Sequence, residues 1–310
     1  MKLNKKIKYK INLRVLWFLC IFFVFITCKT VNNNNLDINE SHVFLIGLDG
    51  WGSYSFNDIR FNMPSVQELM NNGSYTLEAL NVMPSISLPN WSSMLMGAGP
   101  DITGYKTNNP QDNKYGPFPS IFTLLKEQKP QCKAALFYEW STIRFLCPNG
   151  TVDKKRRSSL SWSVSYVRNY IIKEKPHLTV ILINQPDTVG HSAGHNTDAY
   201  YNELNRLDGI ITQILESIKT AGIWNNSIII LSSDHGGLGK THGGDTPMER
   251  NVPFIIAGDN IIKNNKIPQS VRIFDIASTI AHIFNLKAPS FWEGKVINIF
   301  ENDDMRLLTE

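Results

Sequence analysis

The strongest constraint on the fold is a series of short, almost wholly apolar runs that alternate with helix-like segments. These runs occupy residues 42–48, 178–183, 227–231 and 252–257, and polar sequence bounds each of them. A strand that is apolar throughout has both faces buried, as in parallel sheets covered by helices on both sides. The runs therefore predict strands inside an α/β sandwich.

Helix-like segments between these runs supply the covering layers. We expect helices over residues 64–72, 199–220 and 273–284, and the second of these carries Leu and Ile at helical spacing. Strands separated by such helices predict a three-layer α/β sandwich with a mostly parallel central sheet. No repeat or linker interrupts residues 42–305, so we expect one domain there.

The N-terminal region differs from the rest in charge and hydropathy. Basic residues within 1–14 precede the apolar run 15–27, and Cys28 follows directly. This order is typical of a secretory leader, because a bilayer span usually takes about 20 apolar residues. We expect residues 1–28 to be a signal peptide, a lipoprotein-type leader lipidated at Cys28 or an uncleaved anchor, and residues 29–41 to be a polar tether. All three place the folded part outside the cytoplasm, in the periplasm or at the cell surface.

The charge distribution bears on nucleic-acid binding, and the cysteine content bears on disulfide and metal chemistry. The formal net charge is +4, but from residue 28 onward 25 Lys and Arg face 27 Asp and Glu, with no basic stripe interleaved with aromatics. Nucleic-acid binding is therefore not expected. Cys132 and Cys147 could pair in an oxidising compartment or remain buried thiols, and neither has a metal-ligand spacing.

Carboxylate and imidazole side chains follow three of the predicted strands. They are Asp49, Asp187, His191, Asp234, His235 and His242. Ligands gather at the carboxyl ends of strands in open α/β sheets, and these are the donors that zinc takes in sites without thiolates. A single Asp after a strand is commonly a helix cap, and a single His a turn residue. Together, the three Asp and three His are more ligands than one tetrahedral ion needs. The pattern therefore predicts two divalent ions, zinc or alternatively manganese.

Two serines precede a helix expected over residues 90–97. Ser85 and Ser87 both stand where the positive end of that helix would favour an ionised hydroxyl, and either could also be a simple cap. The residues alone do not choose between them.

Five motifs occur in the order found in the alkaline phosphatase superfamily, and they most resemble its type I phosphodiesterase/nucleotide pyrophosphatase branch. The motifs are Gly47-Leu48-Asp49-Gly50, Ser87-Leu88-Pro89-Asn90, Pro186-Asp187-x-x-Gly190-His191, Ser233-Asp234-His235-Gly236 and His242-Gly243. The resemblance covers nearly all of residues 42–300 and implies an alkaline-phosphatase-like three-layer sandwich with a mostly parallel central sheet. It implies a phosphodiesterase or pyrophosphatase that attacks small phosphate esters, from nucleotides or lipids, through a phosphoseryl intermediate on Ser87.

The resemblance also implies the site residues. One ion would be held by Asp49, Asp234, His235 and the Ser87 oxygen, and the second by Asp187, His191 and His242. Asn108 falls where the family contacts a phosphate oxygen, although Asn108-Asn109-Pro110 is also a plain turn.

Departures from the family pattern keep other functions open. The family's nucleophile is commonly Thr, whereas this chain has Ser87. Only six residues separate His235 from His242, and this short connection makes nucleotide specificity doubtful. The alternatives are a phosphomonoesterase, a phosphoethanolamine-type transferase, or an inactive surface-tethered binding protein. A sulfatase is not expected, because Trp91 stands where those relatives carry Arg. Trp91 could stack on substrate or lie in the core, and His195 has no family role.

Overall fold

The computed structural model describes residues 41–112 and 119–301. The predicted leader and all but the last residue of the predicted tether lie outside the described residues, so both stay predictions. Within the described ranges, no helix is long and apolar enough to cross a membrane.

An eight-stranded sheet forms the centre of the fold, in the order β4-β3-β5-β1-β6-β7-β2-β8. The strands are β1 His42–Leu48, β2 Gly73–Leu80, β3 Ala134–Tyr138, β4 Lys154–Arg157, β5 Leu178–Ile183, β6 Ser227–Ser232, β7 Asn251–Gly258 and β8 Asn265–Lys266. The five strands from β4 to β6 pair in parallel. The prediction of a mostly parallel sheet is therefore confirmed.

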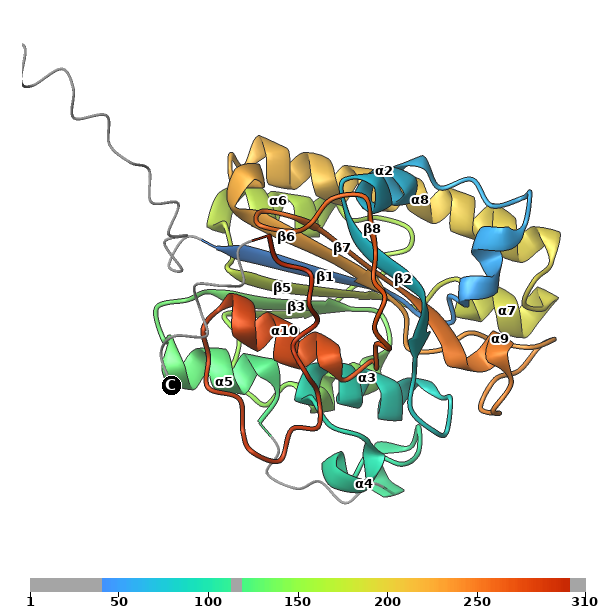
Figure 1. Ribbon diagram of the computed structural model, residues 1–310, viewed down its shortest axis with the longest axis horizontal. Helices are drawn as coiled ribbons and strands as arrows, with labels where there is room; N and C mark the ends of the chain where they lie inside the picture. Colours follow the sequence, from blue (N-terminus) through green and yellow to red (C-terminus); the bar gives the residue numbers. More distant parts are fainter. Residues whose placement is uncertain (1–40, 113–118, 302–310) are drawn as a thin grey trace, which may run out of the picture. The chain divides into compact units, whose positions relative to one another are not determined.

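Helices cover both faces of this sheet (Figure 1). One layer holds α2 (Pro64–Asn71), α6 (Ser165–Glu174) and α8 (Asp198–Thr220), and the other holds α3 (Ser87–Met96), α5 (Ile121–Gln128) and α10 (Asp275–Ile283). Short helices α4 (Pro100–Thr103), α7 (Asp187–Ala193) and α9 (Pro247–Arg250) complete the list. Two buried apolar clusters, one on each face, make the three-layer sandwich.

Two details differ from the expectations. The strand predicted over residues 252–257 runs antiparallel to β6, and it pairs on its other side with β2, which the sequence patterns did not predict. Gly73 starts β2 beside β7, where an added Cβ would lie 2.1 Å from the Ile256 carbonyl oxygen.

Cys132 and Cys147 are both buried free thiols, so the structure selects the unpaired alternative.

Candidate active site

Three neighbouring strands deliver carboxylates to one edge of the sheet. β5, β1 and β6 are adjacent and parallel, so Asp187, Asp49 and Asp234, which follow them, stand side by side. The Asp187 amide donates to the Asp49 carbonyl at 2.9 Å, and this bond ties two of the three strand-end segments together. Figure 1 shows α7 and α9 at this end of the sheet, toward which β1 points.

The first group of side chains consists of Asp49, Asp234 and His235, all buried. One ligand atom from each lies within 4.8 Å of the others. His235 Nε2 is 3.4 Å from Asp49 Oδ1 and 3.3 Å from Asp234 Oδ2. Neither of these two carboxylate oxygens has a hydrogen-bond partner among the described residues.

The protonation state of His235 decides what this group can bind. Its Nδ1 lies 2.8 Å from the Gly236 carbonyl oxygen, an acceptor only, so Nδ1 carries the proton. Burial, followed by the charge of His242, lowers the pKa of His235 well below its ordinary value, so the ring is neutral and Nε2 presents a lone pair. Burial, and then the neighbouring carboxylates, raise the pKa of Asp49. Unpartnered oxygens and a nitrogen lone pair facing one another fit a bound cation.

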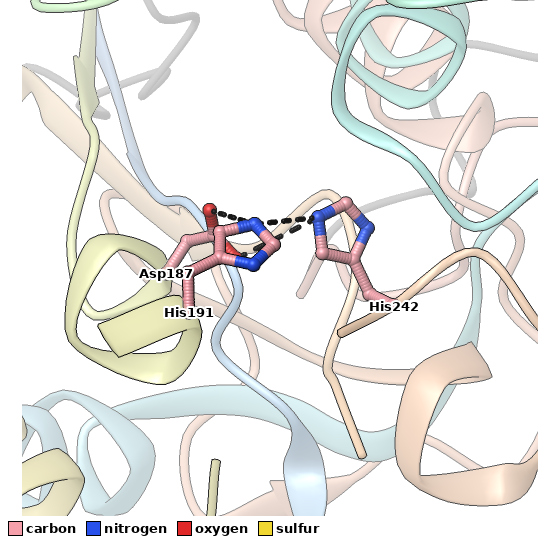
Figure 2. A group of neighbouring side chains, drawn as sticks. All are labelled: Asp187, His191 and His242. Atoms are coloured by element: carbon pink, nitrogen blue, oxygen red, sulfur yellow. Dashed lines mark hydrogen bonds and ion pairs between the residues drawn. The ribbon is translucent and has the colours of Figure 1, made fainter. Parts of the chain in front are cut away.

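The second group consists of Asp187, His191 and His242. Figure 2 shows Asp187 and His191 on one helix. Both point toward the ring of His242, which lies on a separate segment. The two imidazole Nε2 atoms lie 3.2 Å apart, and His191 Nε2 is 3.2 Å from Asp187 Oδ2. Each ring places its Nδ1 3.0 Å from a backbone carbonyl, of Lys240 for His191 and of Ser85 for His242. Donation to those carbonyls turns both Nε2 atoms toward the centre, as in histidines that bind metals.

The two groups form one centre. The rings of His235 and His242, one from each group, stack with centroids 3.7 Å apart. The charge of Asp187 also raises the pKa of Asp234, after the larger effect of burial. The six residues predicted from the sequence are therefore brought together, in the two sets that the resemblance implied.

Ser87 is the serine that faces this centre. It is the first residue of α3, and its Oγ lies 3.1 Å from His235 Nε2. The Ser85 hydroxyl instead donates to the Gly244 carbonyl at 2.6 Å. The helix begins at Ser87 and not at residue 90, so the hydroxyl belongs to its first turn.

Asn108 also lies beside the nucleophile candidate. Its Oδ1 accepts a hydrogen bond of 2.8 Å from the Leu88 amide, next in sequence to Ser87. This contact places the Asn108 side chain at the start of α3, next to Ser87, and its contact with a phosphate oxygen stays a prediction.

Trp91 is a core residue, and the alternative of stacking on substrate is wrong. Only 1% of it is exposed, and its ring packs over Gly47, where an added Cβ would lie 2.5 Å away. Its Nε1–H donates to Asp49 Oδ2 at 3.3 Å, leaving Oδ1 to face His235. No local sequence pattern predicts this bond, because it joins residues 42 positions apart.

Loss of the Trp91 hydrogen bond should destabilise the protein. Trp91→Phe leaves the buried Asp49 Oδ2 without its donor, which costs about 1–3 kcal/mol beyond the lost packing. Trp292→Phe is the matched control, because Trp292 is also buried but its Nε1 has no partner among the described residues. Urea unfolding in chelator measures both free energies. Equal losses in the two variants would show that the Trp91–Asp49 bond contributes nothing.

Comparisons with known proteins agree with this architecture. A sequence profile of the type I phosphodiesterase/nucleotide pyrophosphatase family matches residues 43–122 and 135–249. Rat ectonucleotide pyrophosphatase/phosphodiesterase family member 1 is 25% identical over 239 residues, which cover 67% of this chain and 26% of the rat protein. The chain thus spans about a quarter of that relative's length.

Solved structures show the same fold. Murine ectonucleotide pyrophosphatase/phosphodiesterase 5, as an inactive variant with AMP, superposes with a TM-score of 0.68 at 15% identity, covering 81% of this chain and 96% of that one. A 2-O GAG sulfatase superposes with a TM-score of 0.69 at 14% identity, covering 83% of this chain and 73% of that one. Fold and comparisons define a protein of the alkaline phosphatase superfamily. Within it, the chain belongs to the type I phosphodiesterase/nucleotide pyrophosphatase family.

Proposed function

We propose that this protein is an extracytoplasmic two-metal phosphodiesterase or pyrophosphatase that uses Ser87 as its nucleophile. One observation carries the proposal: unpartnered carboxylate oxygens and imidazole nitrogens converge in two adjoining groups, with the Ser87 hydroxyl beside the more buried one. Family membership and the names of the relatives, which describe ectonucleotide pyrophosphatases and phosphodiesterases, support the reaction class and the location.

The two groups of side chains support an assignment of the candidate ligands to two ions. Asp49, Asp234, His235 and the Ser87 oxygen would hold one ion, and Asp187, His191 and His242 the other. Zinc suits these nitrogen and oxygen donors, with manganese as an alternative. Bound there, the ions supply positive charge that favours an ionised Ser87 hydroxyl and offsets charge on the phosphoryl oxygens.

The chain's own groups then perform the displacement. Ser87 Oγ releases its proton to water and attacks phosphorus. The bond from Oγ to phosphorus forms as the bond from phosphorus to the leaving oxygen breaks, and that oxygen departs with the bonding electron pair. The start of α3 favours negative charge at Oγ. Water then displaces Ser87 from the phosphoseryl intermediate, and the hydroxyl regains its proton. Asn108, beside the Leu88 amide, is placed to contact an oxygen of the phosphoryl group.

A panel of chromogenic esters tests this function on the purified full chain with zinc or manganese. We expect bis-p-nitrophenyl phosphate to be turned over faster than p-nitrophenyl phosphate, p-nitrophenyl sulfate to be nearly inert, and EDTA to abolish turnover. The released p-nitrophenolate is measured by absorbance. Turnover that survives EDTA would refute the metal-dependent mechanism.

A monoester preference would favour the runner-up function. Ser87 in place of Thr and the short connection from His235 to His242 suit a phosphomonoesterase or a phosphoethanolamine-type transferase on the same site. Sulfatase activity would contradict both, because Trp91 stands where sulfatases carry Arg and lies buried against Asp49. A chain that binds metal but turns over none of the esters would indicate a binding protein.

A further inference from the structure

His195 is a buried histidine beside the centre that the proposed reaction does not use. None of its side chain is exposed, and neither ring nitrogen has a hydrogen-bond partner among the described residues. An unpartnered buried polar group costs about 1–3 kcal/mol, so its presence in a native protein calls for an explanation.

The His195 ring fills a slot between two segments that carry candidate ligands. Gly190 of α7 and Gly237 of the segment after β6 both border the ring. A Cβ added to either glycine would lie 2.3 Å from His195 Nε2, so a side chain on either would displace the ring. Gly190 precedes His191, and Gly237 follows His235 by two residues. The ring therefore separates and spaces the two ligand segments.

Hydrogen bonds hold these segments together at the same place. The His195 amide donates to the Gly239 carbonyl at 2.6 Å, and His191 Nδ1 lies 3.0 Å from the Lys240 carbonyl. His195 Nε2 is 3.7 Å from Asp187 Oδ1, which is also buried and unpartnered. That distance is too long for a hydrogen bond, but an N–H at Nε2 would attract the carboxylate electrostatically.

We propose that His195 is a positioning residue for the group formed by Asp187, His191 and His242. Its imidazole spaces α7 from the segment containing Gly237 and directs an N–H toward Asp187, so that the group takes a divalent ion with higher affinity. This inference rests on the proposed metal-dependent function. Partners that orient metal ligands from outside change metal affinity by about 10–100-fold.

Zinc titration of the full chain tests the proposal, with a chromogenic chelator as competitor. His195→Phe fills the slot without a nitrogen. We expect it to weaken the binding of one zinc ion about 10–100-fold. His195→Gln returns an N–H to the slot and should restore part of this loss. Turnover of His195→Phe should recover in excess zinc, which a purely structural defect would not allow. His282→Phe on α10 controls for loss of a histidine outside the centre and should bind zinc as wild type does.

The possible results separate this inference from the function on which it rests. A wild-type chain that binds no zinc would refute the proposed function. A wild-type chain that binds two ions while folded His195→Phe binds both equally well would overturn only the role of His195. If the substitutions at His195 do not fold, Gly237→Ala replaces them, because its methyl group displaces the ring; unchanged zinc affinity in that variant would also overturn the role.

Discussion

Ser87→Ala should lower turnover of the preferred ester by at least about 10³-fold with zinc bound, because removal of a nucleophile removes the covalent route. Ser87 Oγ is the hydroxyl that faces His235 Nε2, at 3.1 Å, and alanine leaves no oxygen to attack phosphorus. Steady-state release of p-nitrophenolate measures the loss. Zinc stoichiometry, measured in parallel, should remain at two ions, because each group keeps its Asp and His residues.

Two variants control for effects on α3. Ser87→Thr keeps a hydroxyl of the kind common in the family and should stay within about tenfold of wild type. Ser93→Ala removes another buried hydroxyl of the same helix, one that donates to the Pro89 carbonyl at 2.8 Å, and should leave turnover nearly unchanged. If Ser87→Ala keeps wild-type turnover with zinc, water is the direct nucleophile and the phosphoseryl route is wrong.

Local sequence patterns predicted the sheet centre and the six ligand candidates. Strands β1, β5 and β6 are buried throughout and almost wholly apolar, so their identity follows from a few consecutive residues, and an Asp follows each within four residues. Because these strands are parallel neighbours, their ends meet at one edge without further information. The partition into two groups needed the family resemblance, since spacing alone does not say which ligands share an ion.

Contacts between distant segments were beyond reach of the sequence. The direction of β7 depends on β2, whose residues pair with it from positions more than 170 apart, for example Leu80 with Asn251. The sequence allowed Trp91 to contact substrate or, as is more common for such a tryptophan, to lie in the core, and its burial and its bond to Asp49 show the second. His195 showed no pattern at all, because its slot is made by Gly190 and Gly237 from separate segments.

Removal of metal should lower the melting temperature of the wild-type chain by about 10 °C or more. An ion present at 1,000 times its Kd stabilises the folded state by about 4 kcal/mol, and each kcal/mol shifts Tm by about 2–4 °C for a domain of roughly this size. Thermal unfolding followed by circular dichroism, in zinc and in EDTA, measures the difference. Equal melting temperatures in the two buffers would contradict a metal centre.

Asp234→Asn should be more stable than wild type in EDTA but less stable than wild type in zinc. Asp234 is fully buried; its Oδ1 accepts from the Gly50 amide, and its Oδ2 lies unpartnered 3.3 Å from His235 Nε2. An asparagine keeps the acceptor toward Gly50 and can turn its NH₂ toward the His235 lone pair. The substitution also removes a carboxylate whose pKa burial and Asp187 raise.

In EDTA, Asp234→Asn should therefore melt about 5 °C above wild type, by relief of about 1–3 kcal/mol. In zinc it should melt below wild type, because one group has lost an anionic ligand. Asp208→Asn is the matched control. Both oxygens of this buried carboxylate accept from amides at the start of α2, Oδ1 from Ser65 and Val66 at 3.1 and 3.2 Å and Oδ2 from Ser65 at 3.2 Å, so an asparagine with one acceptor oxygen and no charge should lower Tm in both buffers. If Asp234→Asn lowers Tm equally in both, Asp234 serves the fold as Asp208 does. If only Asp234→Asn melts above wild type in EDTA and below it in zinc, the buried carboxylate destabilises the protein without a cation and stabilises it with one.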